Sequence, residues 1–287
     1  MALPQTALDQ LPIRRLTHDD LGACADLSEN RGWPREEHKW GLLLSAGTGY
    51  GIDDPSGDGL LTACVLTSYE PGFAAIGMVL VAERYARQGV GRRLMRHVLA
   101  ETGDLPLSLY ATSNGQPLYE ELGFADIGRS EMLMGRFTFT EPAPARTVRP
   151  ATADDLQDVL RLDHEIFGAD RTHLIARLPA FADHLRVAEQ DGQISGFAAL
   201  WPNMDTHVVG PLIAADAATA QALVASLAVA TDRPLRTDVD ARHSSLVTWL
   251  KANGLEQIAT PAVMIRSLPD LPGDWTRRFA PLTVAAG

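Results

Sequence analysis

Two segments far apart in the chain read alike, and this similarity constrains the fold more than any other feature. Residues 13–21 (IRRLTHDDL) and 148–156 (VRPATADDL) each predict a short strand, a threonine N-cap with acidic residues behind it, and a helix. Each half also has, near its end, a predicted helix followed by a glycine and a strand, around residues 118–124 in the first half and 250–255 in the second. We therefore predict two copies of one fold, whose mixture of strands and helices is of the α/β (α+β mixed sheet) class.

A proline-rich stretch without periodicity, residues 141–150, separates the two copies. Domains commonly hold about 100–200 residues, so the chain has room for two. We predict one domain over residues 1–140 and a second over 146–287. In the first half, strands are predicted at 60–68, 74–81, 107–111 and 131–139, and helices at 19–29, 36–45, 90–102 and 115–122.

Composition narrows the class of protein. No apolar run approaches the roughly 20 residues that span a bilayer, and the N-terminal residues lack the pattern of a signal peptide. Cys24 and Cys64 have neither metal-ligand spacing nor a disulfide framework. We expect a cytoplasmic protein with reduced thiols and without a metal or a membrane partner. The net charge of −11 argues against nucleic-acid binding.

A local basic cluster stands out in this acidic chain and indicates a small anionic ligand; it consists of Arg84, Arg87, Arg92, Arg93 and Arg96. The apolar run 75–81 precedes it and predicts a strand, and 90–102 has helical apolar spacing. A helix start carries unpaired N–H groups and a positive dipole, and glycines let a phosphate approach them. The segment between strand and helix fits such a site: Arg87, Gln88, Gly89, Val90, Gly91 and Arg92.

The turn alone does not decide between a phosphate site and a tight turn before a solvated basic helix. Two known phosphate motifs are excluded. A dinucleotide fingerprint needs a third glycine where this chain has Leu94, and a P-loop needs Gly-Lys-Ser/Thr, which is absent.

The downstream segment 109–124 (LYATSNGQPLYEELGF) favours the phosphate site over the simple tight turn. A strand, a glycine turn, a helix, a second strand and then Leu-Tyr-x-x-x-Gly-Phe together resemble the GNAT superfamily of acyl-CoA-dependent N-acyltransferases. The resemblance covers residues 13 to about 139. The second half looks like a degenerate GNAT domain, as in tandem GNAT proteins.

The resemblance implies roles for particular residues. The backbone of Val79, Leu80 and Val81 would meet the pantetheine arm and thioester of acetyl-CoA, or a related acyl-CoA, and the turn 87–92 would hold the pyrophosphate. Asn114 would contact pantetheine, and Tyr119 matches the family's general acid. The chain departs from the family at Ala86, where Gln or Arg is common, and in the spacing around Asn114.

The corresponding strand of the second half is predicted at 207–213, with a helix starting near Asp216. No Gly-x-Gly turn and no arginines precede that helix, and a carboxylate at its start would repel a phosphate. The sequence therefore predicts that only the first half binds coenzyme A.

Attack of an amine on a thioester needs a neutral amine, a donor for the carbonyl oxygen and a proton for the leaving thiolate. Tyrosine, with a pKa of about 10, is protonated at neutral pH and can supply that proton. The general base stays open, because each candidate also fits a solvated helix face, a turn or a cap. The candidates are Glu29, Glu36, Glu37, His38, Glu70, Asp238, Asp240 and His243.

The sequence thus predicts an N-acyltransferase that moves an acetyl or related acyl group to a primary amine by direct attack. Two alternatives are an acyltransferase whose donor is an acyl carrier protein, and a non-catalytic acyl-CoA-sensing protein. Trp33 and Trp40 belong either to the core or to an apolar acceptor wall. The acceptor stays open among amino acids, polyamines, aminoglycosides, biosynthetic intermediates and protein termini.

Overall fold

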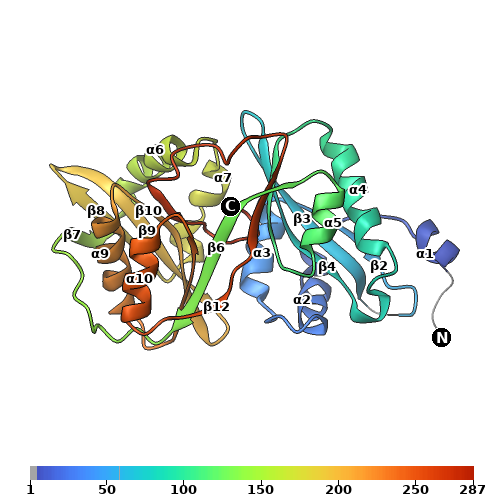
Figure 1. Cartoon of the computed structure of the whole chain (residues 1–287), viewed down its shortest axis with the longest axis horizontal. Coiled ribbons are helices and arrows are strands. Elements are labelled where there is room, and N and C mark those ends of the chain that lie inside the picture. The colour runs from blue at the N-terminus through green and yellow to red at the C-terminus, as the bar shows by residue number, and fades with distance from the viewer. Residues whose placement is uncertain (1–4, 58) are drawn as a thin grey trace.

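A computed structural model describes residues 5–57 and 59–287 of the chain. Two similar halves lie side by side (Figure 1). The first contains α1 (Gln5–Gln10), β1 (Arg14–Leu16), α2 (Leu21–Asn30), α3 (Glu37–Ala46), β2 (Thr48–Asp53), β3 (Leu60–Tyr69), β4 (Phe73–Val81), α4 (Val90–Thr102), β5 (Leu107–Ala111), α5 (Gln116–Glu121) and β6 (Ala125–Gly135). The second contains β7 (Thr147–Pro150), α6 (Leu156–Phe167), α7 (Thr172–Ile175), α8 (Leu178–Phe181), β8 (His184–Gln190), β9 (Gln193–Asn203), β10 (Thr206–Ala214), α9 (Ala217–Ala228), β11 (Leu235–Asp240), α10 (Ser244–Ala252), β12 (Glu256–Ala259), β13 (Ala262–Arg266) and β14 (Arg278–Ala280).

The predicted duplication has a structural counterpart at the start of each half. Thr17 and Thr152 each form a capping box with an aspartate three residues later, Asp20 and Asp155. Arg14 binds the first of these carboxylates through both of its terminal nitrogens, and Arg149 binds the second in the same way. The same local interactions therefore start both copies.

Alternate residues of β3 explain how helices cover both faces of the first sheet. Ala63 and Val65 lie in one buried cluster with the residues of α2 and α3, whereas Cys64 and Leu66 lie in another with the residues of α4. Successive side chains of a strand point to opposite faces, so a central strand between two helix layers is apolar throughout. This explains the unbroken burial of β3 from Leu60 to Thr67.

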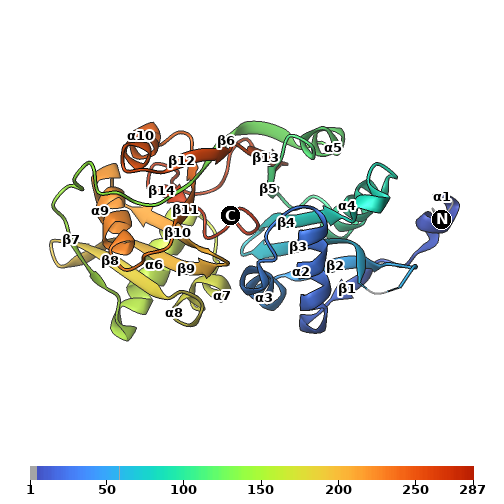
Figure 2. The same ribbon diagram turned by 90° about the horizontal axis from the view of Figure 1, so that it is seen from below.

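The two halves exchange strands where they meet (Figure 2). β6 leaves the first half and pairs with β11, from Ser130 opposite Asp240 to Gly135 opposite Leu235. In return, β13 enters the first half between β5 and β6. The result is one continuous order, β1-β2-β3-β4-β5-β13-β6-β11-β10-β9-β8-β7, with β12 paired to β6 and β14 to β10. Each half therefore completes its sheet with a strand from the other.

The predicted strand at 131–139 is wrong in its bounds, because β6 spans Ala125–Gly135. Its first residues, ADIGRS, are polar or small and do not read as a strand. They form one because β13, from near the other end of the chain, lies alongside them. No helix in the described ranges, 5–57 and 59–287, has the length and apolar character needed to cross a membrane.

Residues 281–287 lie against β4 at the junction of the halves. A Cβ placed on Gly77 would lie 2.3 Å from the carbonyl oxygen of Ala285. The Tyr69 hydroxyl donates to the carbonyl oxygen of Ala286, and Arg171 Nη1 donates to that of Gly287 at 2.7 Å. The 281–287 segment is therefore fixed by contacts with both halves.

Gly77→Ala is expected to lower the free energy of unfolding by about 1–3 kcal/mol, because the added methyl meets backbone atoms that cannot rotate away. Chemical denaturation measures this. Gly128→Ala in β6 is the matched control, since its Cβ would meet no heavy atom within 4 Å. Equal stabilities for the two variants would contradict this close packing.

Candidate active site

A bulge in β4 opens the first sheet. Ala63 pairs with Leu80 and Val65 with Gly77, so one residue of β3 faces two of β4, and Met78 there has a positive φ of 52°. β4 pairs with β5 only at Ala74 and Ala75. Beyond these pairs β4 and β5 separate, which leaves the Met78–Val81 backbone without a β5 partner.

The separated strands border a cavity of about 870 Å³. Most of the residues predicted to bind the donor line it: Val79, Leu80, Val81, Arg87, Gly89, Val90, Gly91, Arg92 and Asn114. Tyr119 lines it as well. The structure therefore brings together in one cavity residues that lie on β4, α4, α5 and the turns between them.

The turn before α4 has the geometry that a phosphate needs. Gly89 is the N-cap residue in the left-handed region, with φ of 75°, and no side chain caps the helix. A Cβ on Gly91 would lie 3.2 Å from a methyl group of Val81, so the helix start packs closely on β4. The first N–H groups of α4 are thus free to bind an anion.

The basic cluster divides into ligand-facing and structural arginines. Arg87 and Arg92 line the cavity. Arg84 instead binds Asp54, and Arg93 donates to the carbonyl oxygens of Leu8 and Leu11. Arg96 lies outside the cavity lining, with its side chain largely exposed.

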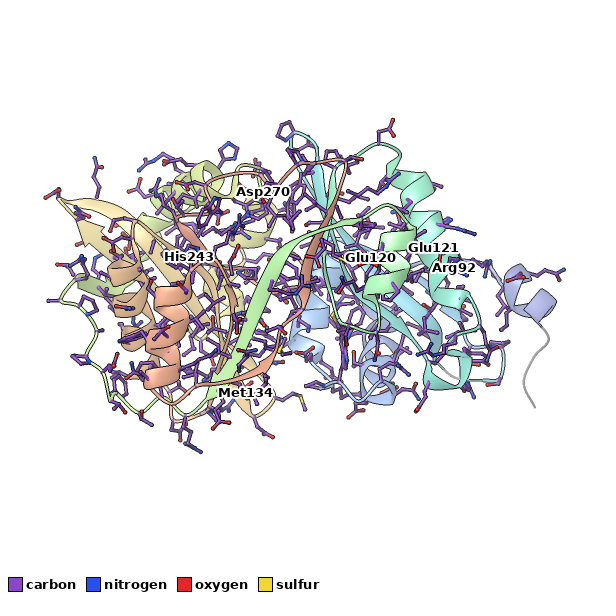
Figure 3. All side chains as sticks on the ribbon, in the orientation of Figure 1. Arg92, Glu120, Glu121, Met134, His243 and Asp270 are labelled. Atoms are coloured by element: carbon purple, nitrogen blue, oxygen red, sulfur yellow. The ribbon has the colours of Figure 1, made fainter. Side chains whose placement is uncertain are left out.

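Arg92 on α4 and Glu121 on α5 lie beside each other (Figure 3), with Nη2 and Oε2 2.6 Å apart. Arg87 makes no side-chain hydrogen bond or ion pair with any residue in the described ranges, and its φ of 60° is left-handed. Gln88 is absent from the cavity lining, and its Nε2 donates to the carbonyl oxygen of Arg84 at 3.0 Å. Within the basic cluster, Arg87 is therefore the arginine that is most available to an anion.

Arg87→Gln is expected to weaken acetyl-CoA binding by about tenfold or more, because a hydrogen bond to a charged group contributes roughly 1.5–3 kcal/mol. Calorimetric titration measures the dissociation constant. Arg96→Gln is the matched control on the same basic segment, and should bind as the unmodified chain does. An equal loss of acetyl-CoA affinity in both variants would show that Arg87 contributes only to the overall positive charge of the segment and does not contact the ligand.

Tyr119 is held by packing and not by hydrogen bonds. Its ring is buried and meets Phe124 edge to face, with centroids 6.1 Å apart. Gly115 makes room for it, since a Cβ there would lie 3.0 Å from the ring. Its hydroxyl has no hydrogen-bond partner among the residues that the structure describes. Burial, with a smaller contribution from Cys64, raises the pKa of Tyr119 above its usual value.

Among the candidate general bases, only Glu36 lines the cavity. Glu29 and Glu37 bind Arg35 in a surface network, and His38 stacks on Phe181. Glu70 lies outside the cavity lining, Asp240 pairs with Arg242, and His243 bonds the carbonyl oxygens of Trp275 and Arg278. Asp238 lies behind the lining, beside Arg236.

Glu36 is the centre of a buried charged group. Lys39 Nζ bonds Oε2 of Glu36, Asn203 Nδ2 donates to Oε1 at 3.0 Å, and Arg236 Nη1 lies 3.5 Å from Oε1. Arg236 Nη2 lies 3.3 Å from an oxygen of Asp238. Burial lowers the pKa of Lys39, an effect that the charge of Glu36 opposes. We name Glu36, Lys39, Arg236 and Asp238 the buried quartet; Glu36 is the N-cap residue of α3, Lys39 lies within α3, and Arg236 and Asp238 lie in β11.

The sequence reasoning missed most of the wall opposite the donor side. Its residues come from the α2–α3 connection and α3, from β6, β11, the end of β12 and the β12–β13 turn, and from the 281–287 segment. They are Arg31, Pro34, Lys39, Met132, Arg236, Ala259, Pro261, Val284 and Ala285. Trp33 also lines the cavity, whereas Trp40 is buried and donates to Ser28 Oγ. No local signal predicts this wall, because the strand exchange assembles it.

The equivalent opening of the second half is filled by the chain itself. β10 carries a matching bulge between Val209 and Leu212 and pairs with β11 only at two residues. β14 lies in the opening, with Leu212 opposite Ala280 and Ile213 opposite Arg278. The backbone that is open in β4 is therefore paired in β10.

The start of α9 is also occupied. Asp216 is its N-cap, as its predicted position implies, and its side chain accepts from Thr219 N at 2.7 Å. Its other oxygen lies 3.6 Å from Arg146. The start of α9 is thus capped by a carboxylate, whereas the first N–H groups of α4 have no side-chain cap.

Comparison with known proteins agrees with this duplicated architecture. Residues 66–141 and 159–280 match two families, both described as acetyltransferase (GNAT) domain. An uncharacterized N-acetyltransferase of Bacillus subtilis (strain 168), YitH, is 28% identical over 255 residues, which are 87% of this chain and 89% of that protein.

Solved structures share the whole fold. A putative acetyltransferase from Pyrococcus horikoshii superposes with a TM-score of 0.81 at 19% identity, over 96% of each chain. A tandem GNAT protein from the clavulanic acid biosynthesis pathway superposes with a TM-score of 0.63 at 13% identity, over 91% of this chain and 100% of its own. The chain belongs to the GNAT acetyltransferase family and carries two GNAT domains in tandem.

Proposed function

We propose that this protein transfers an acetyl or related acyl group from acyl-CoA to a primary amine by direct attack. One observation carries the proposal. The open helix start at Gly89, the Met78–Val81 backbone without a β5 partner and the hydroxyl-bearing ring of Tyr119 all border one cavity. They would serve as an anion site, an extended-chain site and a proton donor, which a pantetheine thioester needs.

Each half has its own part in this proposal. Residues 1–140 form the donor-binding domain, and residues 146–287 form a domain that binds no coenzyme A and shapes the acceptor side. Two features support the second assignment: β14 fills the opening beside β10, and Asp216 caps α9. Because β6 and β13 are exchanged, neither domain has a complete sheet without the other.

The residues of the cavity fit an acyl-CoA. Arg87, Arg92 and the N–H groups at the start of α4 would hold the pyrophosphate, and Asn114 together with Val79–Val81 would hold the pantetheine arm. Acyl-CoA supplies an activated carbonyl carbon and a thiolate leaving group. A backbone N–H of the unpaired β4 segment donates to the carbonyl oxygen as it gains charge. Tyr119 donates its proton to the departing sulfur, and the proton that the attacking nitrogen loses passes through solvent to restore the tyrosine.

The raised pKa of Tyr119 suits this part, because the hydroxyl keeps its proton throughout neutral and mildly alkaline pH. An acyl carrier protein as donor is less favoured, since Arg84 and Arg93 of the basic cluster have partners within the chain. A purely acyl-CoA-sensing role is less favoured as well, since such a role needs no unpartnered hydroxyl in the cavity.

The test is a thiol-release assay with acetyl-CoA and a panel of primary amines, with the product identified by mass spectrometry. We expect amine-dependent release of coenzyme A and an N-acetylated product. Acetyl-CoA binding without transfer to any amine would favour the sensing role. Failure to bind acetyl-CoA, with transfer from a loaded acyl carrier protein, would favour the carrier as donor.

A further inference from the structure

The charges of the cavity are unequal. Five cationic side chains line it (Arg31, Lys39, Arg87, Arg92 and Arg236), against the two carboxylates Glu36 and Glu121. Under the proposed function the phosphates of the donor use Arg87 and Arg92, the second of which already pairs with Glu121. The cations that remain are Arg31, Lys39 and Arg236.

The positive and negative charges of the buried quartet are equal in number and pair with one another. Glu36 is shared by Lys39, Asn203 and Arg236, and Asp238 is bound by Arg236. Both carboxylates are therefore occupied, and neither is free to bind a second ammonium group. A polyamine or an aminoglycoside would bring additional positive charges into a cavity that offers them no partner.

Arg31 takes no part in the ion pairs of the buried quartet. It follows α2 directly, lines the same cavity and is only partly exposed. Its guanidinium makes no hydrogen bond or ion pair with any residue in the part of the chain that the structure describes. A guanidinium of this kind, in a cavity that Trp33 and Val284 also line, suits a single planar anion on an otherwise apolar molecule.

Glu36, which lines the same cavity, has an unusual backbone conformation. Its φ of 44° lies in the left-handed region, which costs free energy for a residue with a side chain. Met78 and Arg87, which also line the cavity, share this unusual backbone. Of the seven non-glycine residues with positive φ in the described part of the chain, these three line the one cavity.

We propose that the acceptor is a primary amine that also carries a carboxylate, and that Arg31 binds that carboxylate while the buried quartet holds the wall behind it. The inference rests on the proposed function and selects among its acceptors. Trp33 and Val284 pack the segment between the two polar ends. The amine end then lies toward Met78–Val81, where the thioester would be.

The test uses matched triplets of amines on one carbon frame: γ-aminobutyrate, its amide and putrescine, and then the same series on an aromatic frame. Each is assayed for acetyl transfer and titrated by calorimetry into the chain saturated with coenzyme A. On at least one frame we expect the carboxylate member to bind tightest, with kcat/KM about tenfold above that of the amide, and the diamine to be weakest.

Variants locate the effect. Arg31→Gln should raise KM for the carboxylate about tenfold, leave KM for the amide unchanged and leave acetyl-CoA binding unchanged. Arg31→Glu should move the preference toward the diamine. Arg161→Gln, which removes an exposed charge outside the cavity lining, is the matched control and should keep the preference.

The inference is overturned if amide or diamine binds as well as the carboxylate on both frames, or if Arg31→Gln keeps the preference. Calorimetric titration of the amines shows whether the carboxylate is preferred even where turnover is slow. Failure of the proposed function looks different: acetyl-CoA does not bind, or it binds and no amine is acylated.

Discussion

Replacement of Tyr119 by Phe is expected to lower kcat by about a hundredfold to ten-thousandfold, the range that a positioned general acid contributes. The dissociation constant of acetyl-CoA should change little. The hydroxyl has no partner among the described residues, so its removal breaks no hydrogen bond within the protein. Ring packing on Phe124 is kept, so the fold should be unaffected.

Steady-state kinetics and calorimetry on the same preparation separate these effects. Tyr50→Phe is the matched control, because Tyr50 is equally buried and lies outside the cavity lining. Below pH 10 the unmodified enzyme should show no loss of activity from deprotonation of Tyr119, since burial raises its pKa. If Tyr119→Phe kept at least half of kcat, Tyr119 could not be the proton donor.

Replacement of Arg236 by Met is expected to cost about 3–5 kcal/mol of unfolding free energy, the usual cost of breaking a buried ion pair from one side. Arg236 is the hydrogen-bond and ion-pair partner that the structure shows for the buried Asp238 carboxylate. It also approaches Glu36 of the other half. The substitution therefore leaves one buried charge uncompensated and loosens the contact between the halves.

Chemical denaturation measures this cost. The double variant Arg236→Met with Asp238→Leu should recover much of the loss, because it removes the stranded charge while Glu36 keeps Lys39 and Asn203. Arg233→Met, on the exposed loop before β11, is the matched control. An unfolding free energy for Arg236→Met equal to that of this control would show that the buried quartet does not stabilise the fold.

Local patterns predicted the elements whose stability is local. α4 and β5 have the predicted bounds, and β3 and β4 differ from theirs by one residue. Each of these carries its own apolar period or run. The donor side of the cavity follows from them, because β4, the glycine turn and α4 are consecutive in the chain.

Distant pairings could not be predicted in this way. β6 begins six residues before the predicted strand because β13 pairs with its polar start. β14 lies beside β10, but the sequence of residues 278–280 does not predict that they fill the opening there. Arg236 lines the cavity because β11 pairs with β6 of the other half, which no local pattern predicts. Arg31 was missed for a different reason, because a single arginine after a helix carries no motif.

The central claim is that one half of a duplicated chain binds acyl-CoA and the other half has filled its equivalent opening. Calorimetric titration of the intact chain with acetyl-CoA tests this most directly. We predict one site per chain, lost or strongly weakened by Arg87→Gln and unchanged by Asp216→Asn, which alters only the start of α9. Two sites per chain, or a single site that responds to Asp216→Asn and not to Arg87→Gln, would contradict the claim.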